Sequence, residues 1–167
     1  MDYCYDCGTK LIEKELEHEG IIPFCPKCNK FVFPIFSAAV SMIVVDKEIK
    51  QTLIIRQYGR SFYNLVAGYI NKGESAEEAV YREMDEEVGL KPISIKPLRT
   101  SYFAKSNTLM YNFLAICDNL DVTSNFEVDD YKWVPIDKGL EGLKGASLAS
   151  SFFSSYLDDV KNNKIWY

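Results

Sequence analysis

The sequence predicts an α+β fold, in which helices cover a β-sheet, with a small cysteine-rich unit in front of it. Two Cys-x-x-Cys pairs lie within the first 28 residues, and apolar runs of strand length follow from residue 37 onward. Two segments with helical spacing stand among and after these runs, at 75–88 and from 146. Strands mixed with two helices favour a layered α+β or α/β/α domain. We therefore expect a small ribbon over residues 1–31 and a larger domain over residues 32–167.

The cysteine-rich unit has the spacing of a zinc ribbon. Cys4 and Cys7 form one pair, Cys25 and Cys28 form the other, and 17 residues separate the pairs. Each two-residue gap lets one tight turn present two thiolates to the same tetrahedral Zn²⁺. Four thiolates leave no open position, so the metal would be structural. Two disulfides or two redox pairs are the alternative, which a reducing compartment disfavours.

The larger domain is predicted to be rich in strands. Six runs have strand-like length and composition: 37–45, 51–57, 61–67, 95–104, 108–117 and 131–136. A polar turn joins the first two, and a short connection makes a hairpin of 95–104 and 108–117. A C-terminal helix begins near Ala146, because the apolar residues that follow fall on one helical face. These residues are Leu148, Phe152, Phe153, Tyr156, Leu157 and Val160.

The acidity of the chain is local. The formal net charge is −5, and the segment 68–90 accounts for all of it, with seven carboxylates against two cations. The rest of the chain is balanced, so no broad basic excess favours non-specific binding to nucleic acid. No apolar run is long enough to cross a bilayer, and the N-terminus lacks a signal-peptide pattern. We therefore expect a cytoplasmic protein without a membrane partner.

The acidic segment is predicted to contain a capped helix. Ser75 and Glu78 have the spacing of a capping box, and Gly89 is a natural terminator after Val88. At 100° per residue, three glutamates cluster within about a third of the helix circumference, beside the apolar stripe that faces the core. These glutamates are Glu83, Glu86 and Glu87.

Three carboxylates at the border of a buried face require cations. A single Arg cannot neutralise all of them, whereas hard divalent ions such as Mg²⁺ or Mn²⁺ prefer carboxylate oxygens and leave positions for water and phosphate. The segment therefore predicts a site for metals that handle phosphate. A solvated acidic face is the alternative interpretation of such a charge run.

The stretch "GYINKGESAEEAVYREMDEEVGL" resembles the Nudix box, G-x5-E-x7-R-E-U-x-E-E-x-G-U, where U is aliphatic. Every fixed position is met: Gly68, Glu74, Arg82, Glu83, Met84, Glu86, Glu87, Gly89 and Leu90. The resemblance implies the Nudix fold, a mixed β-sheet between helices, and Mg²⁺-dependent hydrolysis of a nucleoside diphosphate linked to another group. It implies that three glutamates bind the metal: Glu83, Glu86 and Glu87. It also implies an ion pair between Arg82 and Glu74 that holds the loop to the helix, and the Gly68 carbonyl as a further ligand.

A four-Cys ribbon directly before such a domain is similar to the zinc-ribbon NADH pyrophosphatases. The stretches "AGYINKGES" (67–75) and "EVDDYKWV" (127–134) resemble segments of that subfamily, and the second places Glu127 as a downstream metal-binding or catalytic glutamate. The resemblance implies conversion of NAD(H) to NMN(H) and AMP. Glu87 and Glu127 are both candidates for the group that activates water.

The subfamily signature after the box, Ser-Gln-Pro-Trp-Pro-Phe-Pro-x-Ser, is replaced here by "TSYFAKSNT" (100–108). Phe33 and Tyr69 occupy positions where the subfamily stacks the nucleotide, and Tyr102 and Phe103 are further candidates in the altered stretch. Ordinary core aromatics are the alternative interpretation of Phe33 and Tyr69.

Two other functions compete with NAD(H) hydrolysis. The altered signature favours another diphosphate substrate, such as ADP-ribose, a nucleotide sugar or a different dinucleotide. A catalytically silent nucleotide- or RNA-binding module belongs to another class, and the intact set of box glutamates argues against it. An NAD-capped RNA end is also open as a substrate, since only the cap need enter the site.

The stretch "FVFPIF" (31–36) predicts the assembly state, because five of its six residues are apolar. A small domain rarely leaves so aromatic a segment in water. The resemblance to the zinc-ribbon subfamily and the frequency of two-fold dimers both favour a homodimer built around this stretch. A monomer whose ribbon folds over the stretch is the alternative.

Overall fold

The computed structural model describes residues 2–164. The chain divides into two compact units, residues 1–36 and residues 37–167, which we describe separately. The expected boundary after residue 31 lies inside the first unit and stays a prediction. None of the helices within the described part of the chain is long and apolar enough to cross a membrane.

The first unit is a three-stranded antiparallel sheet, in the order β1 (Ile12–Leu16), β2 (Gly20–Cys25) and β3 (Lys30–Phe31). Within residues 2–36, its cluster of buried apolar residues contains Cys4, Cys25 and Val32 with a few half-buried neighbours, and Phe24 is buried as well. Such a core is small for about 35 residues, so a cross-link between the two Cys-x-x-Cys turns would matter for the stability of this unit.

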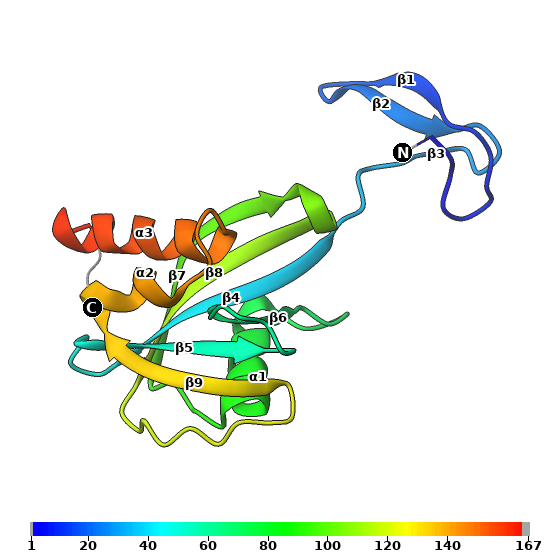
Figure 1. Ribbon diagram of the computed structural model, residues 1–167. Coiled ribbons are helices and arrows are strands. Elements are labelled where there is room, and N and C mark those ends of the chain that lie inside the picture. The colour runs from blue at the N-terminus through cyan, green and yellow to red at the C-terminus, as the bar shows by residue number, and fades with distance from the viewer. Residues whose placement is uncertain (1, 165–167) are drawn as a thin grey trace. The chain divides into compact units, whose positions relative to one another are not determined.

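The second unit contains a six-stranded mixed sheet (Figure 1). Five strands run in the spatial order β7, β8, β4, β5 and β9, and β6 pairs with β4. The β4–β8 pair is parallel and the other pairs are antiparallel. The strands are β4 (Ser37–Asp46), β5 (Gln51–Gln57), β6 (Val66–Tyr69), β7 (Ser94–Phe103), β8 (Thr108–Cys117) and β9 (Val128–Pro135).

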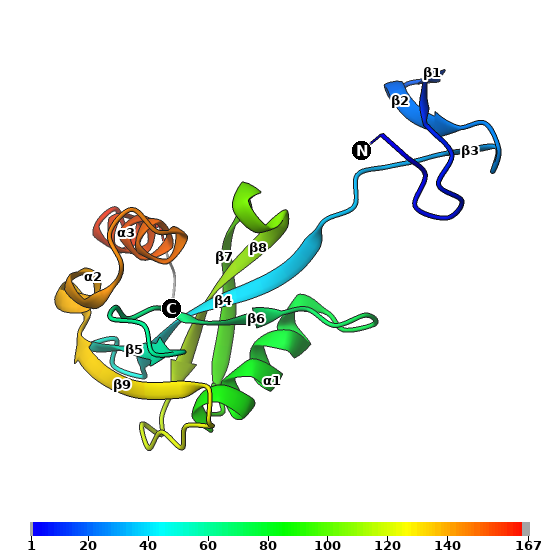
Figure 2. The same ribbon diagram turned by 45° about the vertical axis from the view of Figure 1, so that its right-hand side comes forward.

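Helices cover both faces of this sheet, which confirms the predicted fold class. Helix α1 (Ala76–Val88) lies on one face, and α3 (Leu148–Lys161) lies on the other with the short α2 (Gly139–Gly142) (Figure 2). Side chains of β4 alternate between the two cores, as a period of two requires. Met42 and Val44 join the cluster that contains α1, whereas Ile43 joins the cluster that contains α3. Two 3₁₀ turns, η1 (Ala104–Ser106) and η2 (Ile136–Lys138), complete the unit.

The central strand β4 has different partners along one edge. Its whole length pairs with β8 on the other side, while its first half pairs with β6 through residues 39–42 and its second half pairs with β5 through Val44 and Val45. Strands β5 and β6 therefore diverge from the same edge of β4. The candidate site is built where they diverge.

One predicted strand is wrong over most of its length. Only residues 66–69 of the region 61–69 form a strand, because the preceding residues bond to two different elements instead of one ladder. The Tyr63 N–H donates to the carbonyl of Gly142, 3.2 Å away, while Asn64 exchanges hydrogen bonds with Ile55 of β5. The other predicted strands are confirmed, with β9 beginning three residues earlier than expected.

Candidate active site

Helix α1 has the predicted boundaries, and both of its ends are capped. The Ser75 hydroxyl accepts a hydrogen bond from the Glu78 N–H, and the Glu78 carboxylate accepts one from the Ser75 N–H. Gly89 ends the helix with φ of 65°, a left-handed conformation that glycine adopts at low cost. Because the caps fix the ends and Val80 and Met84 are buried, the rotation of the helix is fixed as well.

Arg82 lies at the centre of an ion-pair network. Its Nε and Nη2 atoms donate to the two oxygens of Glu74, at 2.7 and 2.9 Å. Its Nη1 donates to Glu83 at 2.6 Å and to Glu86 at 3.1 Å, and its Nη2 also reaches the carbonyl of Tyr69 at 2.8 Å. These contacts with Arg82 hold the pKa of Glu74 down to about 2. One guanidinium thus connects the loop after β6 to the helix.

Gly68 provides the surface against which the Glu83 carboxylate lies. A Cβ atom built on Gly68 would come within 1.9 Å of the Glu83 Cδ atom and 2.0 Å of its Oε1 atom. Only a residue without a side chain allows this approach. Burial raises the pKa of Glu83 above its ordinary value, against the hydrogen bond from Arg82, which lowers it.

Glu87 is the buried carboxylate of the group, with 4% of its surface exposed. Its Oε1 accepts a hydrogen bond of 2.9 Å from Gln57 Nε2, whereas its Oε2 is buried and has no hydrogen-bond partner among residues 2–164. Desolvation raises the pKa of Glu87 to about 7, and the Gln57 hydrogen bond opposes that shift. A buried carboxylate oxygen without a donor is costly unless a cation reaches it.

Glu127 reaches the same region from the loop before β9. Its Oε2 accepts a hydrogen bond of 2.6 Å from the hydroxyl of Tyr58, and this contact raises the pKa of Tyr58 to about 12. Gln57 and Tyr58 are therefore neighbours in the chain that each hold a different glutamate. A register shift between Arg56 and Gln57 and a φ of 56° at Tyr58 break the regular strand at this point.

A cavity of about 860 Å³ brings the predicted carboxylates together. It is lined by Glu83, Glu86, Glu87 and Glu127 and by the Gly68 backbone. Of the predicted aromatic residues, Tyr69 and Phe103 also line it.

Tyr102 is not among the residues lining the cavity, although it is the neighbour of Phe103. Adjacent residues of a strand point to opposite faces, and the Tyr102 hydroxyl instead donates to Asn107 Oδ1 at 2.6 Å. Phe33 belongs to the first unit, where 53% of its surface is exposed.

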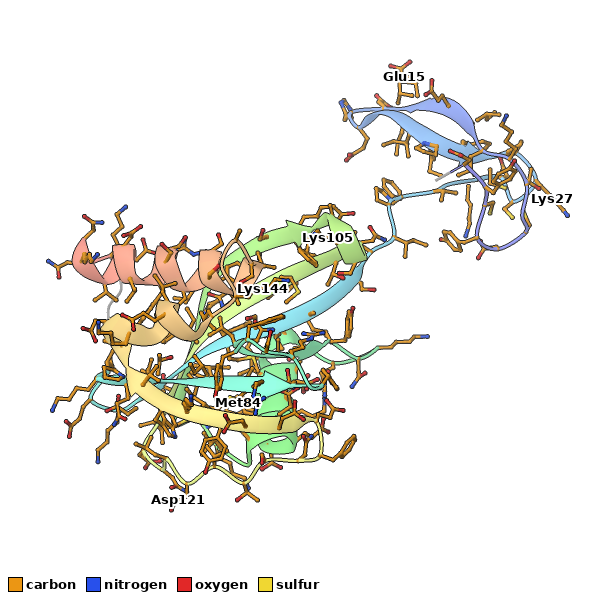
Figure 3. The ribbon with its side chains drawn as sticks, in the orientation of Figure 1. Glu15, Lys27, Met84, Lys105, Asp121 and Lys144 are labelled. Carbon is orange, nitrogen blue, oxygen red and sulfur yellow. The ribbon has the colours of Figure 1, made fainter. Side chains whose placement is uncertain are left out.

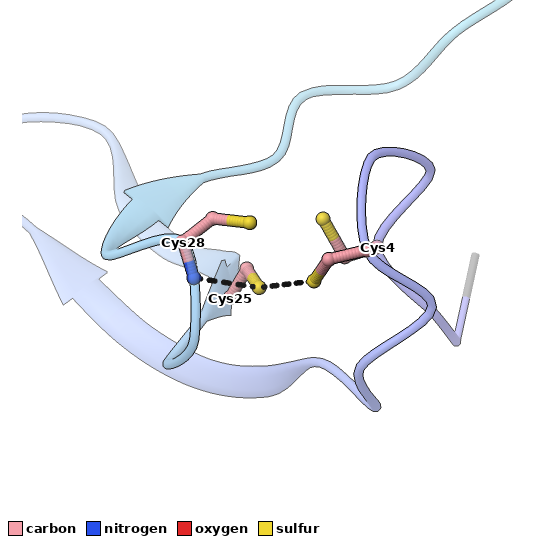
Figure 4. A group of neighbouring side chains, drawn as sticks. Cys4, Cys25 and Cys28 are labelled. Atoms are coloured by element: carbon pink, nitrogen blue, oxygen red, sulfur yellow. Dashed lines mark hydrogen bonds between the residues drawn. The ribbon is translucent and has the colours of Figure 1, made fainter.

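The four cysteines of the first unit converge on one point. Their Sγ atoms all lie within 4.8 Å of one another, and among residues 2–164 no other group of three or more Cys, His, Asp or Glu meets that spacing. Figure 4 shows Cys4, Cys25 and Cys28 directed toward one another. The Cys28 N–H donates to Cys25 Sγ at 3.3 Å, a contact typical of a knuckle. Hydrogen bonding to Thr9 lowers the pKa of the Cys7 thiol to about 6, whereas the hydrogen bond with Cys7 raises the pKa of the Cys28 thiol to about 12.

The fold and the carboxylate site define a member of a known enzyme family. The model of the NUDIX domain matches residues 36–152, and the chain therefore belongs to the Nudix family. A crystal structure of a NUDIX hydrolase from Nitrosomonas europaea has the same fold, with a TM-score of 0.64 at 17% identity over 97% of this chain and 93% of that one. The NUDIX domain of Shewanella oneidensis NrtR, solved with ADP ribose, gives 0.62 at 19% identity, over 85% of this chain and 94% of that one.

Within the family, the chain is similar to proteins of the NudC type. It is 30% identical over 144 residues to the NAD-capped RNA hydrolase NudC of Chromobacterium violaceum, covering 84% of this chain and 52% of that protein. It is 33% identical over 141 residues to the chloroplastic Nudix hydrolase 19 of Arabidopsis thaliana, covering 78% and 32%. The chain thus spans about half, or less, of the length of these relatives.

Proposed function

We propose that the second unit hydrolyses the diphosphate of a nucleotide derivative, with NAD(H) as the best candidate. Water would add across the P–O–P bridge, so that NAD(H) gives NMN(H) and AMP. The observation that carries this proposal is the buried, unpartnered Oε2 of Glu87 in a cavity lined by three more glutamates. Membership of the Nudix family and the similarity to NudC proteins support it.

The donor set fits a hard divalent cation, Mg²⁺ or Mn²⁺. Carboxylate oxygens are the preferred ligands of such ions, and the unpartnered oxygen of Glu87 supplies one that the protein itself does not satisfy. When bound, the ion would draw negative charge off the diphosphate and make a neighbouring water more acidic. The residues proposed to hold it are Glu83, Glu86, Glu87 and Glu127, with the carbonyl of Gly68.

The remaining steps belong to side chains of this chain. Glu87 or Glu127 takes the proton of the attacking water, and both stay candidates for that role. Gln57 and Tyr58 orient these two carboxylates through the hydrogen bonds described above. Tyr69 and Phe103 offer aromatic faces to a base within the cavity. The ion pair of Arg82 with Glu74 is proposed to keep the loop against the helix.

Incubation with NADH and Mg²⁺, followed by chromatography of the products, tests the function. We expect NMNH and AMP in equal amounts. The altered stretch 100–108 favours a second candidate, hydrolysis of another diphosphate. ADP-ribose, a nucleotide sugar, a diadenosine polyphosphate and an NAD-capped RNA should therefore be compared in parallel. Binding without turnover of any of them, with either Mg²⁺ or Mn²⁺, would instead indicate a silent nucleotide- or RNA-binding module.

The Gly68→Ala substitution is expected to lower turnover by about 10- to 100-fold, because a misplacement of about 1 Å in a catalytic group costs this much. The new Cβ overlaps the Glu83 carboxylate, which must rotate away from the backbone. The overlapping atoms are the far end of a flexible side chain, so the melting temperature should hardly change. The Gly145→Ala protein is the matched control, since a Cβ there meets nothing within 4 Å. Full activity of Gly68→Ala would contradict the placement of Glu83 in the site.

In the first unit, we propose that Cys4, Cys7, Cys25 and Cys28 hold one structural Zn²⁺. Four thiolates within mutual contact distance are the ligand set of closed zinc sites. Such a site requires reduced thiols, which supports the cytoplasm as the proposed location.

We expect a homodimer in solution. Phe33, Ile35 and Phe36 are 53, 52 and 46% exposed in the single chain, and a self-complementary contact would remove this apolar surface from water. Light scattering at micromolar concentration should give twice the 19.1 kDa of one chain. The Phe33→Ser, Phe36→Ser double variant should shift the mass toward one chain. A wild-type mass near 19.1 kDa that does not change on concentration would contradict the dimer.

A further inference from the structure

The segment 58–64, which we call the wall segment, lines the cavity with every second residue. These residues are Tyr58, Arg60, Phe62 and Asn64. Two of the residues between them bond to strand β9 instead. The Gly59 N–H donates to Asp129 Oδ2 at 2.7 Å, and the Tyr63 hydroxyl donates to Asp130 Oδ2. Neighbouring aspartates of one strand therefore hold the wall segment at two points.

The far end of the wall segment is held by several contacts at once. Besides its hydroxyl, Tyr63 uses its N–H, which donates to the carbonyl of Gly142. The Lys132 Nζ atom lies 4.8 Å from the centroid of the Tyr63 ring, and Arg56 Nη2 lies 3.7 Å from Asp130 Oδ2. Because these contacts come from three elements, the far end does not depend on any single one of them.

The near end is a tight turn that the local sequence does not favour. The Arg60 N–H donates to the carbonyl of Gln57 at 3.2 Å, and the two residues between them, Tyr58 and Gly59, have φ of 56° and 65°. Positive φ at both central residues is the pattern of a type I′ turn, whose first central position favours Asn, Asp or Gly. A tyrosine is uncommon in this conformation. The turn therefore requires support from contacts outside itself.

An irregularity of β9 supplies such support. The register with β5 passes from Asp130 directly to Val128 and leaves out Asp129. A bulge of this kind can redirect the side chain of the extra residue. The Asp129 carboxylate accordingly reaches the Gly59 N–H. Asp129 itself is exposed and is not among the residues that line the cavity.

We propose that Asp129 is a positioning residue for the hydrolysis: it fixes the turn at Gly59, and the turn holds the Tyr58 hydroxyl on Glu127. The inference rests on the proposed function, in which Glu127 binds the divalent cation or activates water. Asp129 then touches neither the substrate nor the cation and acts only through Tyr58. Its removal should consequently matter only while the Tyr58 hydroxyl is present.

A double-mutant cycle with NADH as substrate tests this dependence. Asp129→Ala and Tyr58→Phe should each lower kcat about tenfold, because each leaves Glu127 less precisely placed. The double variant should also lose only about tenfold, since both changes remove the same orientation of Glu127. Two independent roles would instead multiply to a loss of about a hundredfold. Such a multiplied loss would overturn the proposal.

Two further variants separate the hydrogen bond from the charge of Asp129. Asp129→Asn keeps an oxygen that can accept the Gly59 N–H, and it should retain most of the wild-type kcat. If Asp129→Asn loses as much as Asp129→Ala, the negative charge is responsible and the proposed anchoring is wrong. Asp121→Ala is the matched control and should leave kcat unchanged. Asp121 is exposed in the loop before β9, as Figure 3 shows.

Amide exchange of the full chain, measured by NMR, tests the anchoring without any need for turnover. In Asp129→Ala the Arg60 amide should exchange about tenfold faster, because its bond to Gln57 closes the turn. An unchanged rate would overturn the role of Asp129 and leave the proposed function, provided that the wild type hydrolyses NADH. A faster rate, in a protein whose wild type hydrolyses none of the diphosphates, would support the anchoring and overturn the proposed function.

Discussion

The Glu87→Gln protein is expected to hydrolyse NADH at least about a hundredfold more slowly than the wild type, because loss of metal polarisation is worth several kcal/mol and each 1.36 kcal/mol is tenfold in rate. Gln keeps the shape of the side chain, and its amide oxygen can still accept the hydrogen bond from Gln57. The variant loses the buried charge that we propose to bind the divalent cation. Steady-state kinetics at saturating Mg²⁺ measure the effect, and near-wild-type turnover would contradict the assignment of Glu87.

The same variant should be more stable than the wild type when a chelator removes divalent ions. Burial holds the pKa of Glu87 at about 7 in the folded protein, above its ordinary 4.5. The unfolded chain therefore releases the Glu87 proton at a lower pH than the folded chain does. The free energy of unfolding of the wild type consequently falls as the pH rises from about 4.5 to about 7. Above pH 7 the free energy of unfolding of the Gln variant should exceed that of the wild type by about 1–3 kcal/mol. Thermal unfolding of both proteins across this pH range, in the presence of the chelator, measures whether the variant is the more stable one.

The Glu77→Gln substitution is the matched control for both measurements. Glu77 lies on the same helix, is exposed, and does not line the cavity. It should change neither turnover nor the pH dependence of stability. If Glu77→Gln lowers turnover as much as Glu87→Gln does, a general loss of negative charge on α1 is responsible and the site-specific interpretation is wrong.

The Cys7→Ser protein is expected to lose its zinc and to unfold its first unit while the second unit stays folded. The buried apolar residues described in the first unit are few, namely Cys4, Phe24, Cys25 and Val32, so we expect the proposed metal to supply most of its folding free energy. Elemental analysis should give about one zinc per chain for the wild type and none for the variant. Limited proteolysis should then cleave before residue 37 and leave a resistant fragment.

Cys117→Ala is the control for this experiment. Cys117 is fully buried in the second unit, in the core that contains α1. Its removal should lower the stability of the second unit and leave the zinc content at one per chain. Wild-type protein that contains no zinc after purification under reducing conditions would contradict the proposed zinc ribbon.

Local signals explain which parts of the fold were predictable. The ends of α1 follow from side chains within one helical turn, Ser75 with Glu78 at the start and Gly89 at the end. The long buried strands follow from their own runs of apolar residues. The segment 61–65 was predicted wrongly because its backbone bonds to residues far away in the chain, Ile55 and Gly142. Strand β1 of the first unit is short, exposed and mostly charged, so it has no apolar pattern to detect.

The residues of the candidate site also differ in whether the sequence predicts them. The box glutamates could be named from spacing, since one helix presents them. Gln57 and Tyr58 could not, because their role depends on which strand ends beside α1 and on a break in that strand. Asp129 could not either, since it reaches the Gly59 N–H only where β9 lies beside the end of β5.

The break at the end of β5 limits how this site can be altered or transplanted. In a regular strand, Gln57 and Tyr58 would point to opposite faces, and only one could reach a glutamate. The register shift after Arg56 and the left-handed backbone of Tyr58 direct both toward the carboxylates. Deleting one residue between 55 and 59 would therefore turn the side chains that follow to the opposite face of the sheet. Glu87 and Glu127 would both lose their hydrogen bonds from this strand end. An engineer who grafts these side chains onto another scaffold must copy the irregular backbone with them.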